Sequence, residues 1–143
     1  MLVQAILKNK PPGFVSVTPD LPVGGVVDVL AQKGIGAVLV VENGELVGIL
    51  SERDIVRSLS RRAAQTLELT AADLMTPNPI TATPETTTEQ AMEIMTERHF
   101  RHLPIVENGR LTGLVSIGDV VKARIDQSQH EVETLRVYVA GNV

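Results

Sequence analysis

An internal repeat is the feature that most constrains what this chain can fold into. The segment Val41–Gly44 returns as Val106–Gly109, and both read Val-Glu-Asn-Gly. At the same offset of 65 residues, Phe14–Leu59 aligns without a gap on Pro79–Arg124. An ungapped match of this length indicates two copies of one structural unit, and such a repeat decides the fold before any single element is assigned.

Each copy has the hydrophobic pattern of a β-α-β-β-α unit. Apolar residues at steps of three and four predict helices, and short apolar runs bounded by turn residues predict strands. Asn43-Gly44 and Asn108-Gly109 each join two apolar runs, which is the strongest short signal for a β-hairpin. The expected elements are 15–17, 23–33, 37–41, 45–50 and 52–60 in the first copy, and 80–82, 88–98, 102–106, 110–115 and 117–127 in the second.

The repeat also sets the expected domain organisation. One copy is too short to bury a sizeable core, so we expect two pseudo-symmetric copies packed as one α/β module. We assign the first repeat to residues 1–62, a partly helical linker to 63–70 and the second repeat to 71–127. The tail, 128–143, is expected to extend the last helix and then fray.

Composition removes several classes of function. The net charge of −4 argues against nucleic acid as a partner, because binding its backbone needs a basic surface. Cysteine is absent, which excludes disulfides and thiolate metal sites. No nearby set of acids completes a metal shell around His99 and His102, and His130 is remote from them. No apolar run reaches the roughly 20 residues of a membrane span and no signal peptide is recognisable, so no membrane partner and a cytoplasmic location are expected.

The pattern Gly-h-h-Ser-x-x-Asp, where h is aliphatic, occurs at the same place in both copies. It reads Gly48–Asp54 in the first and Gly113–Asp119 in the second, where a strand ends and a helix begins. A helix start offers free N–H groups to an anion, and an Asp one turn later offers two acceptor oxygens to ribose hydroxyls. Ser-x-x-Asp is also close to a capping box, so capping and ligand binding both remain open.

A basic pair distinguishes the two copies. Arg101 and His102 stand where the second copy enters its hairpin, and the matching positions of the first copy are Gly36 and Ala37. An Arg fork matches phosphate oxygens, so the second copy is expected to carry the better phosphate site, with Arg53 compensating in part in the first. The alternative is a basic edge that is only solvated.

The doubled pattern resembles a tandem pair of cystathionine β-synthase (CBS) domains, a Bateman module. The resemblance is carried by the repeated Gly-h-h-Ser-x-x-Asp, by the strand Leu103–Val106 and by the Thr-Pro that follows each first strand. It implies two clefts for an adenosine ligand: AMP, ADP, ATP or NAD(H), and after these S-adenosylmethionine. It implies no required cofactor.

The resemblance also implies roles for individual residues. Asp54 and Asp119 would hold ribose hydroxyls, and the two Ser of the motif would lie near ribose or phosphate. The backbone of Thr76–Ile80, and of Gly13–Val15 in the first copy, would meet the adenine edge. The full set expected to bind nucleotide is Ser51, Arg53, Asp54, Thr76, Asn78, Ile80, Arg101, His102, Pro104, Ser116 and Asp119.

These expectations define a non-catalytic regulatory module. No acid–base or nucleophile constellation is present, so we expect no enzyme. A nucleotide bound between the copies would favour one arrangement of them, and an unidentified partner protein would respond, which is a form of energy or redox sensing. The family resemblance implies a homodimer. The main alternative is a ligand-free homodimerisation module that uses Ser-x-x-Asp only as helix caps.

Overall fold

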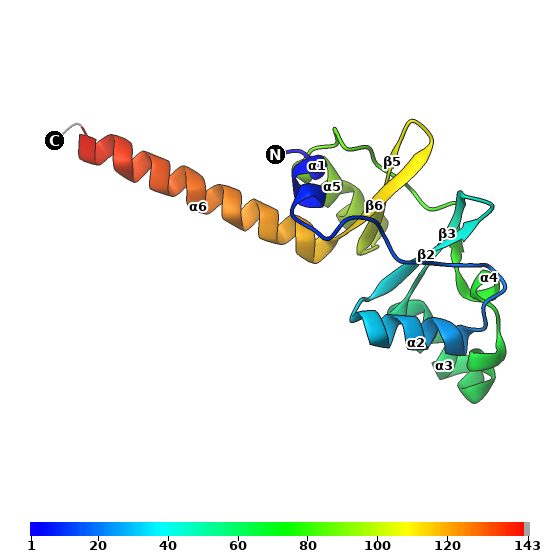
Figure 1. Cartoon of the computed structure of the whole chain (residues 1–143). Coiled ribbons are helices and arrows are strands. Elements are labelled where there is room, and N and C mark those ends of the chain that lie inside the picture. Colours follow the sequence, from blue (N-terminus) through cyan, green and yellow to red (C-terminus); the bar gives the residue numbers. More distant parts are fainter. Residues whose placement is uncertain (142–143) are drawn as a thin grey trace. The chain divides into compact units, whose positions relative to one another are not determined.

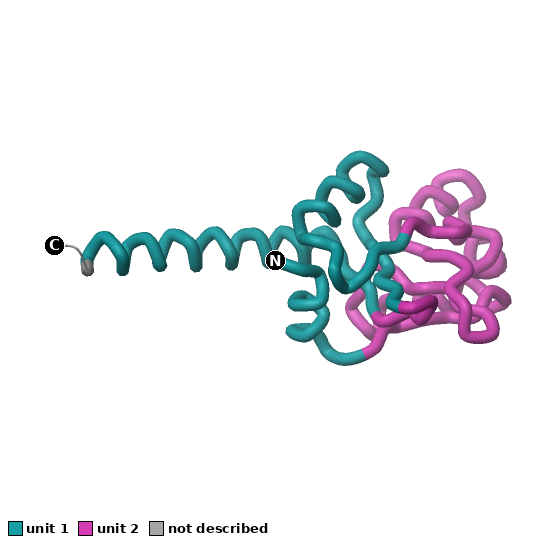
Figure 2. Tube along the Cα trace, turned by 90° about the horizontal axis from the view of Figure 1, so that it is seen from above, with its two compact units in different colours: residues 1–12, 81–107, 113–143 teal, residues 13–80, 108–112 magenta. Residues whose placement is uncertain are grey.

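The computed structural model describes residues 1–141, which form two compact units (Figure 2). Of the described residues, unit 1 contains 1–12, 81–107 and 113–141, and unit 2 contains 13–80 and 108–112. Each unit is therefore assembled from segments that are distant in the sequence. Most of their helices and strands are labelled in Figure 1.

Unit 2 is built around a four-stranded sheet of order β1-β2-β3-β4. Strand β1 lies parallel to β2, whereas β2–β3 and β3–β4 are antiparallel. Its core is aliphatic, with Val26, Val38 and Leu50 among the buried residues. The elements are β1 (Ser16–Val17), α2 (Val23–Lys33), β2 (Ala37–Glu42), β3 (Glu45–Ser51), α3 (Glu52–Arg62), a 3₁₀ helix (Ala63–Glu68), α4 (Ala71–Leu74) and β4 (Thr76–Pro77).

Unit 1 packs three helices with a two-stranded sheet formed by β5 and β6. Its core is also aliphatic, with Val3, Met95, Leu103 and Ile105 among the buried residues. The elements are α1 (Val3–Lys8), α5 (Thr88–Arg98), β5 (His102–Glu107), β6 (Arg110–Ser116) and α6 (Ile117–Gly141). In both Figure 1 and Figure 2 the second half of α6 extends away from the rest of this unit.

The short helices that begin the two repeats each pack with the other repeat. Helix α1 lies at the start of the first repeat, but the Val3 N–H donates to the Thr86 carbonyl at 2.8 Å within unit 1. Helix α4 lies at the start of the second repeat, but the Ala71 N–H donates to the Leu21 carbonyl at 2.8 Å within unit 2. The compact units therefore have different boundaries from the sequence repeats.

Most predicted elements are confirmed, and three differ. The expected strand 80–82 is reduced to a single bridge between Ala82 and Ile105, because prolines at 79 and 84 remove N–H donors on either side. The last helix ends at Gly141 rather than at 127 because the tail extends it, as expected, and positions 142–143 lie outside the described residues. Helix α3 ends at Arg62 rather than at 60.

Both predicted hairpin turns are present. Asn43 and Gly44 have φ values of 52° and 81°, and Asn108 and Gly109 have φ values of 52° and 77°. Two successive residues with positive φ are what a two-residue hairpin turn of the right twist requires, and Asn and Gly adopt that conformation most easily. These turns bring the ends of β3 and β6, and so the Ser-x-x-Asp motifs, back beside the starts of β2 and β5.

Candidate functional site

The first Ser-x-x-Asp motif is a capping box at the start of α3. The Asp54 N–H donates to Ser51 Oγ at 3.3 Å, and Asp54 Oδ2 accepts from the Ser51 N–H at 3.0 Å and from its hydroxyl at 2.9 Å. Both bonds to the carboxylate end on Oδ2, and Oδ1 has no hydrogen-bond partner among the described residues. Capping therefore uses one carboxylate oxygen and leaves the other able to accept a bond from a ligand.

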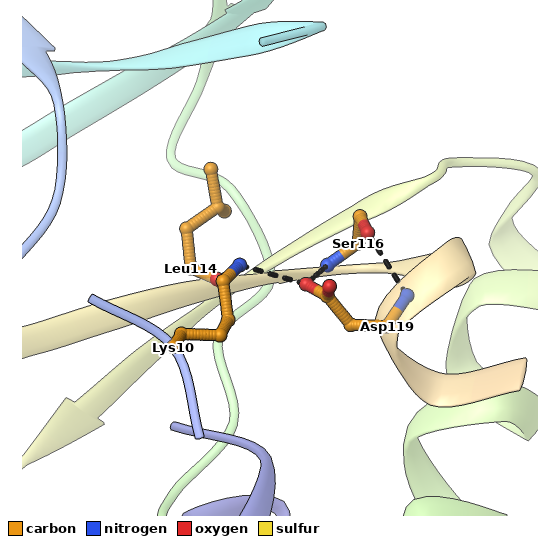
Figure 3. Close-up of polar contacts among 4 residues, drawn as sticks. All are labelled: Lys10, Leu114, Ser116 and Asp119. Carbon is orange, nitrogen blue, oxygen red and sulfur yellow. Dashed lines mark hydrogen bonds and ion pairs between the residues drawn. The ribbon is translucent and has the colours of Figure 1, made fainter. Parts of the chain in front are cut away.

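The second motif repeats this geometry at the start of α6 and adds a cation (Figure 3). The Asp119 N–H donates to Ser116 Oγ at 3.1 Å, and Asp119 Oδ2 accepts from the Ser116 N–H at 2.9 Å. Lys10 Nζ lies 2.7 Å from the same Oδ2 atom and also donates to the Leu114 carbonyl at 2.9 Å. Oδ1 again has no partner among the described residues.

The environment of Asp119 favours its charged form. Partial burial by itself would raise the pKa of Asp119, but the hydrogen bonds from Lys10 and from the Ser116 N–H, together with the positive charge of Lys10, outweigh it. The pKa of Asp119 consequently lies below its usual value. Asp119 is an ionised hydrogen-bond acceptor at neutral pH, which is the state that suits ribose hydroxyls.

The N–H groups at both helix starts are partly used within the protein. The Glu52 N–H donates to the Gly36 carbonyl at 2.9 Å, and the Ile117 N–H donates to the Arg101 carbonyl at 2.8 Å. Together with the Ser caps, two first-turn N–H groups of each helix are satisfied internally, so cationic side chains are the main groups left for a phosphate. The second bond also fixes the backbone of Arg101 beside the Asp119 motif.

The two motif glycines provide room for a neighbouring segment. A Cβ built on Gly48 would lie 3.0 Å from the Thr76 carbonyl oxygen and closer still to the Met75 side chain. A Cβ built on Gly113 would lie 2.7 Å from Leu7 Cδ2. These glycines therefore have a packing role, and their place in the motif needs no ligand to explain it.

The segment Thr76–Ile80, expected at the adenine edge of the second copy, instead lies in unit 2 beside the first motif. Thr76 pairs with Ile49 in the β3–β4 ladder, and the Asn78 N–H donates to the Val47 carbonyl at 3.2 Å. Thr76, Asn78 and Ile80 are all exposed. Thr76 and Asn78 therefore lie beside β3, the strand that ends at Ser51. Ile80 is the last residue of segment 13–80 of unit 2.

The remaining predicted residues differ in accessibility. Arg53 and Arg101 are exposed, and His102 is half-buried as the first residue of β5. Pro104 is buried in β5, where its carbonyl accepts from the Ala82 N–H at 2.9 Å. Arg101, His102, Ser116 and Asp119 all belong to unit 1, and the bond from the Ile117 N–H to the Arg101 carbonyl places the start of β5 next to the second motif.

Lys10 is the residue of this site that the sequence did not indicate. It lies in unit 1 with Asp119 although 109 residues separate them, and its position 65 residues later is Met75. Because it stands outside the repeated segment, no repeat comparison selects it. Its side chain is 37% exposed, so it remains accessible to a bound anion.

Metal binding and membrane spanning find no support in the described part of the chain. Residues 1–141 contain no group of three or more His, Asp or Glu arranged to hold a metal ion. None of the helices formed by these residues is sufficiently long and apolar to cross a bilayer.

Comparison with known proteins identifies the family. The family profile described as CBS domain matches residues 7–61 and again 71–126. The chain is 42% identical to a CBS-domain containing protein from Agrobacterium tumefaciens of known structure, with a TM-score of 0.84, covering 87% of this chain and 99% of that one. The chain belongs to the CBS domain family and forms the tandem pair known as a Bateman module.

Two further relatives are informative. A CBS domain protein from Pyrobaculum aerophilum, solved in complex with AMP, is 28% identical with a TM-score of 0.74, covering 83% of this chain and 89% of that one. The mitochondrial CBS domain-containing protein CBSX3 of Arabidopsis thaliana is 36% identical over 129 residues, which cover 87% of this chain. The chain spans 63% of the length of that relative.

Proposed function

We propose that this chain is a regulatory module that binds an adenine nucleotide, such as AMP, at the two Ser-x-x-Asp helix starts. One observation carries the proposal: within residues 1–141, Oδ1 of Asp54 and of Asp119 has no hydrogen-bond partner. Each capping box occupies Oδ2 and leaves Oδ1 as an acceptor for a ribose hydroxyl. The AMP complex of the Pyrobaculum relative supports this ligand class.

In this proposal the site of unit 1 binds phosphate more strongly. Arg101 and His102 provide cationic and donor groups beside Asp119, and Lys10 is close enough to move from Asp119 to a phosphate. In unit 2 Arg53 would take this role beside Asp54. The backbone of Thr76, Asn78 and Ile80, expected from the repeat to serve the second copy, would meet the adenine edge here instead. Pro104, which is buried, would act by shaping the strand rather than by touching the ligand.

Binding would act on an unidentified partner protein by favouring one conformation of the module, and the module itself would catalyse no reaction. We also propose that two copies associate as a homodimer, which the exposed apolar side chains of α3 and α6, such as Val56 and Leu135, support. A ligand-free dimerisation module remains the second candidate, because both motifs serve as helix caps whether or not a ligand binds.

Calorimetric titration of capping-box variants separates the two candidates. Asp54→Ala and Asp119→Ala each remove a proposed ribose acceptor, so AMP affinity should fall by about 1–3 kcal/mol per site. Asp73→Ala is the matched control, because Asp73 forms an equivalent capping box with Thr70 in α4, with bonds of 2.9 and 3.3 Å, and has no proposed ligand role. Its AMP affinity should equal that of the wild type.

The ligand itself is identified by a panel of AMP, ADP, ATP, NAD⁺, NADH and S-adenosylmethionine. A ligand that binds only the folded protein raises its melting temperature by mass action. If none of the six raises the melting temperature and none gives a calorimetric signal, the nucleotide proposal is wrong and the dimerisation module is correct. Equal loss of affinity in all three Asp→Ala variants would mean that the caps act only through folding.

A further inference from the structure

The second half of α6 carries an exposed apolar stripe. Every residue from Ser128 to Ala140 is exposed, and the apolar side chains Val132, Leu135 and Val139 are 51%, 62% and 57% exposed. An isolated helix of about a dozen residues is only marginally stable in water. A long exposed helix with this stripe is therefore expected to pack against a partner.

The spacing of the stripe identifies the kind of partner. Five apolar side chains and Ser128 follow one another along α6 at alternating steps of four and three residues. This is the heptad repeat of a coiled coil rather than the broader apolar face of a core helix. Position a is β-branched throughout and the last d position is leucine, a combination that in a parallel coiled coil favours two strands. The a positions are Ile125, Val132 and Val139, and the d positions are Val121, Ser128 and Leu135.

The charges beside the stripe fit a second copy in parallel register. Glu131 is a g position and Arg136 is the e position of the next heptad, and in a parallel pair these two positions face each other across the interface. Two copies would thus form two symmetric Glu–Arg pairs. Neither side chain is committed elsewhere, since Glu131 accepts only a 3.4 Å bond from Gln127 and Arg136 has no ion pair among the described residues.

The stripe continues onto the body of unit 1. Val121 and Ile125 are 40% and 51% exposed, while their neighbours Val120 and Ala123 face the core. A shallow, mainly apolar groove begins here between α5 and α6, and it is lined by Met92, Val121, Arg124, Ile125, Ser128 and Gln129. A partner helix lying along the stripe would therefore cover this groove as well.

We propose that α6 of a second copy of this chain packs along this stripe, so that two chains form a parallel, in-register coiled coil over residues 121–139. The proposal specifies the interface of the homodimer proposed above and rests on that dimer, but not on nucleotide binding.

The test measures molar mass in solution by light scattering across a range of concentrations. The wild type should have twice the chain mass of 15.4 kDa. Leu135→Asp places a charge on the stripe and should weaken self-association at least tenfold. Val137→Asp is the matched control, because Val137 is on the same turn and equally exposed at 67% but lies off the stripe; this variant should stay dimeric.

Two further variants test orientation and register. Glu131→Lys should weaken the dimer and the double variant Glu131→Lys with Arg136→Glu should restore it, because the pair is exchanged across the interface. The chain has no cysteine, so Val139→Cys can form a disulfide only between two copies, and only a parallel register brings the two positions together.

The outcomes are distinguishable. A wild type that is monomeric at every concentration overturns both the dimer and the coiled coil. A wild type that is dimeric, with Leu135→Asp equally dimeric, overturns the coiled coil and leaves the dimer. A higher oligomer, or a Val139→Cys variant that forms no disulfide under oxidising conditions, overturns the parallel two-stranded arrangement. None of these results changes the nucleotide proposal, which the Asp54 and Asp119 variants test.

Discussion

The ion pair between Lys10 and Asp119 links the N-terminal segment to the second motif, and replacing Lys10 with methionine removes the charge while keeping most of the side-chain volume. At the observed Nζ–Oδ2 distance of 2.7 Å, Coulomb attraction amounts to about 1.5 kcal/mol in bulk water and about 6 kcal/mol at an effective dielectric constant of about 20. The two side chains are 37% and 26% exposed, so the lower figure applies better.

Several costs reduce this attraction. Ordering the lysine side chain and desolvating both charges oppose it, and partly exposed ion pairs usually stabilise proteins by about 0.2–1 kcal/mol. Lys10 also donates a hydrogen bond to the Leu114 carbonyl, and this bond stabilises the folded chain as well. We therefore expect Lys10→Met to lower the free energy of unfolding by about 1 kcal/mol at neutral pH.

The effect should depend on pH with a definite sign. The pKa of Asp119 is lower in the folded chain than in the unfolded chain, so its contribution is complete above the unfolded value of about 4. The contribution is lost as the pH falls through the folded pKa and the carboxylate takes up a proton. The stability difference between the wild type and Lys10→Met should therefore shrink as the pH is lowered through and below this range.

Urea unfolding followed by far-ultraviolet circular dichroism measures this difference, since the chain lacks tryptophan. Lys8→Met is the matched control: Lys8 is an exposed lysine of the same segment with no ion pair among the described residues, and its loss should change stability little. A difference between the wild type and Lys10→Met that is unchanged from neutral to strongly acidic pH would refute the electrostatic reasoning, as would an equal effect of Lys8→Met.

Two packing predictions follow from the structure of unit 2. Gly48→Ala should destabilise the chain by about 1–3 kcal/mol in thermal or urea unfolding, because its Cβ would overlap the Met75 side chain. Gly24→Ala is the control and should be neutral or stabilising, because its Cβ would meet nothing closer than 3.5 Å. Equal effects of the two substitutions would contradict the close approach at Gly48. Ser58→Ala should lower the free energy of unfolding by about 1–3 kcal/mol, because it leaves the fully buried Thr66 hydroxyl without its 2.8 Å partner. The double variant Ser58→Ala with Thr66→Val should recover most of that loss in the same unfolding assay.

Local features of the sequence were sufficient for most elements of the fold. The Asn-Gly turns, the apolar spacing of α2 and α5 and the Ser-x-x-Asp caps act over a few residues, so their physical chemistry is contained in short segments. The repeat then predicts that the elements formed by one copy of the sequence also form in the other. The same caps left capping and ligand binding undecided, because a Ser and an Asp at this spacing suit both.

The tertiary structure decided what depends on distant segments. The capping bonds use only Oδ2 of Asp54 and Asp119, and the choice of oxygen depends on the three-dimensional arrangement of the motif. Lys10 contacts Asp119 because α1 buries its apolar face in the core of unit 1 rather than against the rest of the first repeat.

The sequence by itself determined the repeated β-α-β-β-α units, their hairpins and the position of the two acidic motifs, since each follows from periodicity and turn chemistry within a short window. Only the tertiary structure decided which repeat each flanking helix joins, which cation meets Asp119 and how far α6 continues beyond its core contacts. These depend on burial of complementary apolar surfaces, and such surfaces exist only once the separated segments have come together.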